Sequence, residues 1–420
     1  MALLNGAHPS AGTSRKLAWS AGIAVLALLV LAAFHFLLYR PGASPPPTAQ
    51  RTDGMAWARD VERRNSTGHE AAQAIVAAGH SFSVVGHTNS QQPGLQQAWV
   101  LQFTEAPPPR WERAYGGKLG TVGRAIALLP GGGLVLAGEE QVAPEKFRGW
   151  LLALSPEGSV LWERTPGREG FNGLKAVTVL EDGSIITGGT QDGAGWLVRL
   201  DPWGELLWEV KLSQLEQITA LVALPALRVA VVGVAESSTT GLGSSRLLLV
   251  EPDGRTTRER RLPAEGQGEL AALGLLPDEG LIATGRRSPP GSTDWNLWVV
   301  RLDKGGETLW DRVLNGPQVE AGHAVTAVAD SGVAVVGYTL KDMADRETKV
   351  WRFSAEGELL WQQSYGGAGD DLGYGIARLA DESLVVVGST TSRGAGKTDL
   401  WTFRLSPEGQ LLWEEMFGAP

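Results

Sequence analysis

One ten-residue pattern recurs along this chain and constrains its fold more than any other feature. It reads SPEGSVLWER from Ser155, DPWGELLWEV from Asp201, SAEGELLWQQ from Ser354 and SPEGQLLWEE from Ser406. The tryptophans of successive copies lie 46 to 54 residues apart, except for one interval of 102 residues in which an arginine takes the tryptophan place. This period predicts a chain of repeated structural units of about 50 residues each.

Two tryptophans, twelve residues apart, mark most repeats. One opens a run such as WLVRL at Trp196, and the other lies in the LLW segment that follows. In one repeat both markers are arginine, Arg246 and Arg258, and in another Lys349 takes the first place, yet the separation is unchanged. A constant interval around a glycine-containing turn indicates two strands joined by a short turn. We assign a structural packing role to the marker tryptophans, which are Trp99, Trp111, Trp150, Trp162, Trp196, Trp208, Trp298, Trp310, Trp361, Trp401 and Trp413.

A glycine after a β-branched run marks another strand of each repeat, as in VVGHT at Gly86, ITGGT at Gly188 and VVGST at Gly388. A short run of small and aliphatic residues precedes it, so each repeat reads as four strands. Four short antiparallel strands repeated seven times predict an all-β, seven-bladed β-propeller over residues 55–420. The segment around Trp57 is one surplus outer strand. We expect it to be a lead-in and the strand of Trp413 to complete the last blade.

The two ends of such a propeller differ in their connections. The turns that join the first strand to the second and the third to the fourth are short and uniform, whereas the other connections vary in length. Binding residues usually lie on variable loops held by a rigid scaffold. We expect a partner-binding face whose candidate residues are Asp370, Asp371 and Tyr374 in the YGGAGDDLGYG loop, together with Trp203 in a turn. For the acidic pair we favour a turn-capping or solvated role over a cation site, because one loop offers too few of the oxygen ligands that Ca²⁺ prefers. We assign no metal ligand, cofactor or catalytic residue.

The N-terminal segment differs from the repeats. Residues 17–39 contain no Asp, Glu, Lys or Arg, and as a helix at ~1.5 Å per residue they would span about 34 Å, enough for a hydrocarbon core of ~30 Å. Arg15 and Lys16 place residues 1–16 in the cytoplasm. Residues 40–54 are rich in proline and predict a spacer. The prediction is a single-pass anchor in the bacterial inner membrane with the propeller in the periplasm or outside; a cleaved signal peptide is the alternative.

Composition excludes several classes of function. The chain has no cysteine, which rules out disulfides, thiolate metal sites and a thiol nucleophile. Its formal net charge of −9 argues against a nucleic-acid partner, which would require a basic stripe.

The repeated hairpin resembles the repeats of bacterial quinoprotein-like propellers, in which Gly-x-x-x-Trp closes each blade. The segments that carry the resemblance are LDPWGELLWEV from Leu200 and LWQQSYGGAGDDLGYGIARL from Leu360. Quinoprotein dehydrogenases of this shape bind a quinone with a vicinal disulfide and Ca²⁺, and a chain without cysteine cannot carry over that site. Non-enzymatic relatives, including a scaffold lipoprotein of outer-membrane assembly, imply a protein-interaction role.

The sequence therefore favours a non-enzymatic envelope protein. We expect a membrane-anchored platform, without a cofactor, that binds another envelope protein or polymer. A glycan-binding module that uses exposed aromatic side chains is the alternative. A degenerate quinoprotein-type enzyme is the second alternative.

Overall fold

The structure is a computed structural model that describes most residues from Ala56 onward. The described ranges are 56–60, 68–90, 95–117, 119–167, 172–235, 243–263, 266–289, 294–316, 318–342, 345–394 and 397–418, all within the compact unit Arg51–Pro420. The predictions for residues 1–16, 17–39 and 40–54 lie outside them. Within the described ranges, no helix has the length and hydropathy that a membrane crossing requires.

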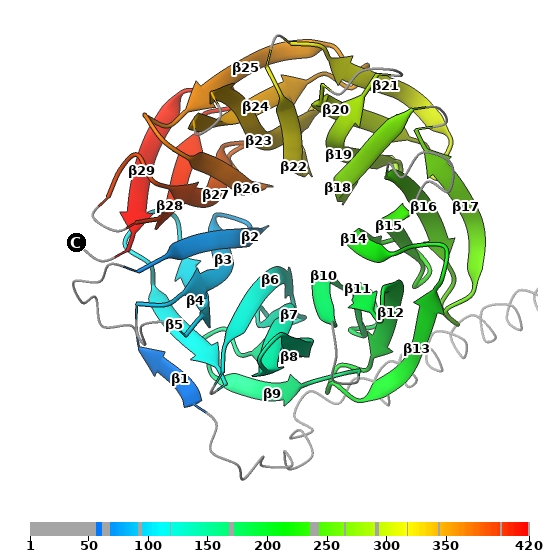
Figure 1. The fold of residues 1–420 in the computed structure, drawn as a ribbon, viewed down its shortest axis with the longest axis vertical. Helices are drawn as coiled ribbons and strands as arrows, with labels where there is room; N and C mark the ends of the chain where they lie inside the picture. The colour runs from blue at the N-terminus through cyan, green and yellow to red at the C-terminus, as the bar shows by residue number, and fades with distance from the viewer. Residues whose placement is uncertain are drawn as a thin grey trace, which may run out of the picture. The chain divides into compact units, whose positions relative to one another are not determined.

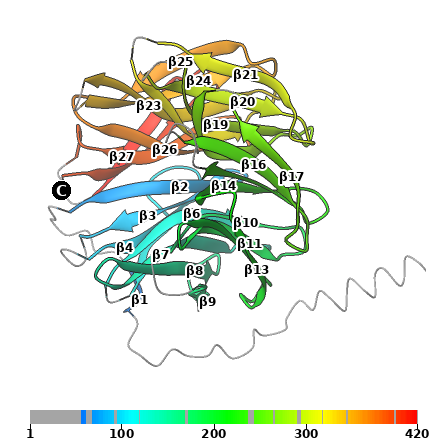
Figure 2. The same cartoon turned by 45° about the vertical axis from the view of Figure 1, so that its right-hand side comes forward.

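The described chain is all β, and its antiparallel sheets surround a central axis (Figure 1). Within a sheet, successive strands run from the axis to the perimeter, as Figures 1 and 2 both show. The inner strands are β2 (Glu70–Ala78), β6 (Thr121–Leu128), β10 (Gly173–Val179), β14 (Gln217–Ala223), β18 (Gln267–Leu275), β22 (Glu320–Ala327) and β26 (Asp371–Arg378). The second strands are β3 (Ser81–Thr88), β7 (Leu134–Ala143), β11 (Ile185–Gln191), β15 (Val229–Ala235), β19 (Leu281–Ser288), β23 (Val333–Asp342) and β27 (Leu384–Thr390).

The other two strands of each sheet contain the tryptophan markers. The third strands are β4 (Gln97–Phe103), β8 (Lys146–Leu154), β12 (Ala194–Leu200), β16 (Ser244–Val250), β20 (Asn296–Leu302), β24 (Asp345–Phe353) and β28 (Asp399–Leu405). The outer strands are β5 (Trp111–Gly116), β9 (Val160–Arg164), β13 (Leu206–Leu212), β17 (Thr256–Leu262), β21 (Thr308–Leu314), β25 (Leu359–Tyr365) and β29 (Leu411–Phe417).

Two sheets depart from the four-stranded pattern. The groups β14–β17 and β18–β21 count as one eight-stranded sheet because Ser244 and Gly268 form a single parallel pair between them. The first sheet has five strands, since β1 (Ala56–Asp60) pairs with the edge of β5, with Ala56 opposite Gly116. β29 completes the last sheet by pairing with β28. The described chain is therefore a β-propeller of four-stranded antiparallel units, one of which gains an extra edge strand.

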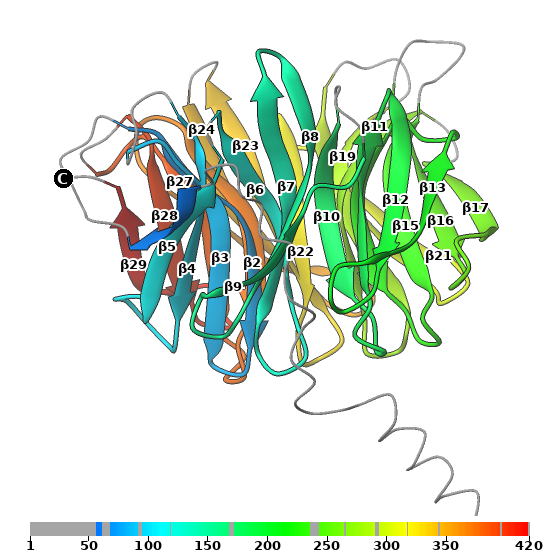
Figure 3. The ribbon, with the colours of Figure 1, turned by 90° about the horizontal axis from the view of Figure 1, so that it is seen from below.

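The connections lie at two ends of the propeller, which Figure 3 shows from the side. We call the end with the inner-to-second and third-to-outer turns the turn end. We call the end with the second-to-third and outer-to-inner connections the loop end. Antiparallel pairing within each sheet fixes this division, so every inner strand begins at the loop end.

The third-strand tryptophans are buried between neighbouring sheets. Trp196 is 1% exposed and joins Val198 in a hydrophobic cluster with Val135 and Ala153 of the preceding sheet. Its indole N–H donates to the carboxylate of Glu209 on its own outer strand at 3.1 Å. Matching indole–carboxylate bonds join Trp150 to Glu163, Trp298 to Asp311 and Trp401 to Glu414. An acidic residue directly follows the outer-strand tryptophan in these repeats, and this explains why: the buried indole of the third strand needs a hydrogen-bond acceptor.

The outer-strand tryptophans hold the turn of the following sheet. Trp310 Nε1 donates to the carbonyl of Ala355 at 2.8 Å, and its ring lies against Gly357 of the same turn. Gly357 has a φ of 80°, and a Cβ there would lie 2.8 Å from the ring, so glycine is required twice over. Arg312 donates to the carbonyl of Gly357 at 2.9 Å. The same indole bond joins Trp111 to Pro156, Trp162 to Pro202, Trp208 to Pro252 and Trp361 to Pro407.

Two junctions between sheets use other contacts. Where Arg258 replaces the outer tryptophan, it forms an ion pair with Glu307 in the following turn, and Arg260 pairs with the same carboxylate. Trp413 instead packs on Phe82 of the first sheet, with ring centroids 6.3 Å apart. Its Nε1 has no hydrogen-bond partner among the described residues.

A β-bulge on each inner strand explains the second-strand glycines. In the last sheet the pairing shifts between Gly373 and Gly375, which leaves Tyr374 as the extra residue. The bulge brings the carbonyl of Leu372 so close to Gly388 that a Cβ there would lie 1.8 Å from its oxygen. The same contact, at 1.8 to 2.3 Å, occurs at Gly86, Gly138, Gly189, Gly233, Gly285 and Gly337. In the third sheet the glycine in this position is Gly189, so the choice of Gly188 from the sequence was wrong by one residue.

Adding a methyl group at a second-strand glycine should therefore be costly. We expect Gly388→Ala to lower the free energy of unfolding by about 2 kcal/mol or more, because only a backbone shift can relieve the clash. Urea unfolding followed by tryptophan fluorescence measures this. Gly305→Ala is the matched control, since its nearest contact is the Asp303 side chain at 3.2 Å. Equal stability of the two variants would contradict the explanation.

The sheet β14–β17 lacks both marker tryptophans and relies on ion pairs such as Arg246–Glu259. Exposed ion pairs contribute about 0–1 kcal/mol and are screened by salt. We expect the amides of β16 and β17 to exchange hydrogen faster than those of the corresponding strands, and faster still at about 1 M salt. Arg258→Trp should slow this exchange. Uniform protection across all sheets would show that the tryptophans contribute little.

Candidate functional site

The bulges place one extra residue of each inner strand near the loop end. We call these residues the axial ring. They are Gln73, Arg124, Lys175, Thr219, Ala271, His323 and Tyr374. Their chemistry is mixed: most are polar, and the ring includes two basic side chains and two aromatic ones.

Several ring residues reach the inner strand of the following sheet. Lys175 Nζ donates to Gln217 Oε1 at 2.6 Å, and Thr219 Oγ1 donates to the carbonyl of Leu270 at 2.8 Å. Lys175 is exposed, but the crowded surroundings and the charge of Arg124 lower its pKa. Its bond partner is a neutral amide, so the positive charge of Lys175 is not balanced by that bond.

His323 is held between two tyrosines. Its ring stacks on Tyr374 with centroids 5.2 Å apart and tilts against Tyr338 at 5.3 Å. Its Nδ1 lies 2.9 Å from the carbonyl of Gly373, which can only accept, so the proton is on Nδ1. Burial lowers the pKa of His323 and raises that of Tyr374. The pair is therefore uncharged near neutral pH and offers flat aromatic faces.

Ion pairs at and beside the ring join inner strands to second strands. Arg124 pairs with Glu139 at 2.6 Å, and Arg286 pairs with Glu269 at 2.5 Å. The guanidinium of Arg286 also lies over the Trp295 ring, 4.4 Å from its centroid. Charges, amides and aromatic faces thus meet at the loop end, an arrangement suited to recognition by hydrogen bonds and stacking.

The structure separates the two carboxylates predicted as an acidic pair. Asp370 accepts two bonds from Arg346, at 2.9 and 2.7 Å, and this pairing lowers its pKa. Asp371 is fully buried and accepts from Thr390 Oγ1 at 2.5 Å and Ser392 Oγ at 2.7 Å. Asp371 therefore closes its own loop, and the two carboxylates do not converge on one point. The described residues hold no group of three or more His, Asp or Glu that could bind a metal ion.

Trp203 lies at the opposite end from the other predicted residues. It occupies the turn between β12 and β13 and is 42% exposed. Its backbone N–H donates to Asp201 Oδ1 at 2.9 Å. Tyr374 and Asp370 belong to the loop end, so the four predicted residues do not form one surface.

Sequence reasoning missed the basic part of the ring and its half-buried neighbour His87. His87 lies on β3, and its Nδ1 has no hydrogen-bond partner among the described residues. Burial, with the charges of Arg124 and His69, lowers its pKa to about 4. The signal that could have located the ring is the second-strand glycine, because the residue it opposes directly precedes the bulge.

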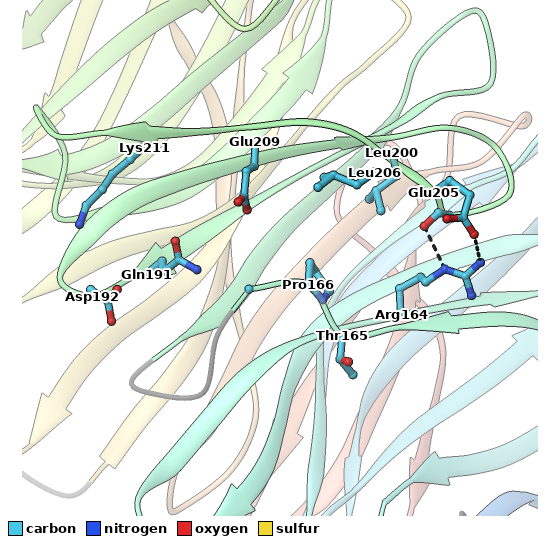
Figure 4. A pocket seen from close by; sticks show the side chains of 12 residues that line it. Arg164, Thr165, Pro166, Gln191, Asp192, Leu200, Glu205, Leu206, Glu209 and Lys211 are labelled. Atoms are coloured by element: carbon cyan, nitrogen blue, oxygen red, sulfur yellow. Dashed lines mark hydrogen bonds and ion pairs between the residues drawn. The ribbon is translucent and has the colours of Figure 1, made fainter. Parts of the chain in front are cut away.

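A groove of about 630 Å³ lies on the perimeter, away from the ring (Figure 4). It runs between β9 and β13, and Arg164, Glu205, Glu209 and Lys211 are among its lining residues. Arg164 binds Glu205 at 2.7 Å, so part of its charge is already paired.

Comparisons with known proteins give fold likeness at low sequence identity. The propeller domain of the Trilobed protease from Pyrococcus furiosus is 11% identical over 84% of this chain and 96% of its own, with a TM-score of 0.49. A protein of unknown function from Dyadobacter fermentans is 12% identical over 83% of this chain and 97% of its own, with a TM-score of 0.47. No protein-family model matches the chain. No curated protein matches it.

The low pKa of His87 links stability to pH. Between about pH 6.5 and 4 the unfolded chain binds a proton at this residue and the folded chain does not, so stability falls as pH falls. The full difference is about 3 kcal/mol. We expect His87→Gln to lose less stability than the wild type between pH 7 and pH 4.5, measured by urea unfolding. His80→Gln, at an exposed turn, is the control; identical pH slopes for all three proteins would contradict the assignment.

Proposed function

We propose that this chain is a seven-bladed propeller, anchored outside the cytoplasm of a bacterium by residues 17–39, that binds another envelope protein or polymer without catalysing a reaction. The count of seven takes the eight-stranded sheet as two blades, since only Ser244 and Gly268 pair between them. The hydrophobic clusters support it, because each lies between two neighbouring four-stranded units.

The axial ring is the observation that carries the proposal. It gathers an exposed lysine bonded to a neutral amide, a tyrosine-stacked histidine and Arg–carboxylate pairs on strands at the loop end. Polar and aromatic groups held on a rigid scaffold favour recognition of a large partner. The proposed anchor rests on the 23 uncharged residues of 17–39, whose length suits a bilayer.

A glycan-binding function is the second candidate, and the exposure of Trp203 favours it. A tryptophan that is 42% exposed in a turn offers a face on which a sugar could stack. In that case the working surface would be the turn end and not the loop end.

Cross-linking in cells tests the proposed function. A photoreactive residue at position 175 in the full chain should give a discrete adduct with one partner, and the same residue at position 203 should not. The chain should stay in the membrane after an alkaline wash, and a protease added outside the cytoplasmic membrane should cleave it. A cytoplasmic propeller, or adducts at 203 alone with glycan retention lost in Trp203→Ala, would overturn the proposal.

A further inference from the structure

The leucines of the repeated LLW segment are exposed on the outer strands. On β21, β25 and β29, which follow one another around the perimeter (Figure 1), five leucines form what we call the outer leucine arc. Their exposed fractions are 57% for Leu309, 38% for Leu359, 53% for Leu360, 46% for Leu411 and 53% for Leu412. Their exposed surface adds up to the order of 400 Å² over three strands, which is comparable to the largest apolar patch of a typical soluble protein, and such patches are often functional.

Packing of the propeller does not account for these leucines. The tryptophan, glycine and arginine of the repeat each contact a neighbouring sheet, as at Trp361, which bonds to the Pro407 carbonyl. In β17 the same two positions are Thr256 and Thr257, and that strand pairs with β16 in the same register as its counterparts. The fold therefore accepts polar residues at this place, and leucine there needs another reason.

An apolar groove of about 430 Å³ adjoins the arc between the last two sheets. Its apolar lining comprises Val328, Leu360, Trp361, Leu384 and Pro407. The charged residues Asp330, Arg352, Glu382 and Glu408 also line it, and Arg352 pairs with Asp330. A groove of this kind can receive a large apolar side chain from a partner, which is how binding surfaces anchor their ligands.

Carboxylates border the arc on the turn side. Glu356, Glu358 and Glu408 are exposed and form no ion pair among the described residues. Two of these carboxylates accept from turn hydroxyls: Glu356 from Ser354 Oγ at 3.0 Å and Glu408 from Ser406 Oγ at 2.8 Å. One cation lies at the same border, Arg312, whose guanidinium donates to the Glu356 carbonyl at 3.0 Å. The surface is thus apolar with a border that carries three carboxylates against one cation.

We propose that the outer leucine arc docks a protein partner whose apolar side chains are flanked by Lys and Arg. Its apolar face would cover Leu359, Leu360, Leu411 and Leu412, with one side chain in the groove, and its cations would meet the three glutamates. The negative charge of the three glutamates favours a cationic protein over the other possible partners. Anionic lipid headgroups would be repelled by these carboxylates, and a second copy of the arc would bring like charges together.

The test uses the full chain in phosphatidylcholine nanodiscs and a fluorescein-labelled amphipathic peptide of leucine and lysine as the probe. We expect Leu359→Thr with Leu360→Thr to weaken binding, read by anisotropy, at least tenfold. This pair copies Thr256 and Thr257 of β17, so the thermal midpoint should not change. The matched control, Leu206→Thr with Leu207→Thr on β13, should change affinity less than twofold.

Charge supplies the second half of the test. Glu356→Gln with Glu358→Gln should weaken peptide binding several-fold, and a peptide of leucine and glutamate should not bind. Equal affinity of the Leu359/Leu360 variant and the wild type would overturn the proposal. So would self-association in sedimentation, or binding to anionic vesicles, that this variant abolishes while the leucine–lysine peptide fails to bind.

Discussion

The structure depends on the contact between most outer strands and the turn of the following sheet. An indole such as that of Trp310 bonds to a turn carbonyl and covers the glycine beside it, Gly357. A four-stranded sheet has little core of its own, so stability must come from the surfaces between sheets. The repeated ten residues therefore contain both partners of this contact. The tryptophan of one copy packs on the turn of the next copy.

The repeated glycines of the second strands set the geometry of the loop end. A glycine on the second strand allows the inner strand to bulge, and the bulge adds one residue whose side-chain type differs from sheet to sheet. That residue is Arg124, Lys175, His323 or Tyr374 in different sheets, while its neighbours stay small or aliphatic. The residue types are thus nearly constant where sheets contact each other and variable where the inner strands face the axis. A binding site can diversify there without cost to the packing.

Much of the fold was predictable because its signals are local and repeated. The strand order and the marker tryptophans follow from spacing. Spacing left two strands that could complete the last sheet, and the expected one, the strand of Trp413, does so. The pairing of β1 with β5 does not, since one surplus strand carries no sign of which edge it joins. The candidate site was harder. Asp371 looked available in the sequence but is buried in its loop, and Arg124 shows its role only once the bulge is known.

The two arginines of the β14–β17 sheet show that both marker tryptophans can be replaced without loss of the fold. Arg246 binds Glu259, the partner position that a tryptophan would have used. Arg258 binds the Glu307 side chain in the following turn, in place of the turn carbonyl that a tryptophan would have used. The same sheet has Thr256 and Thr257 where its neighbours expose leucines. Contacts that hold sheets together are replaced by equivalents, whereas the exposed leucines are simply absent there. That contrast separates the part of the motif that serves the fold from the part that is free to serve a partner.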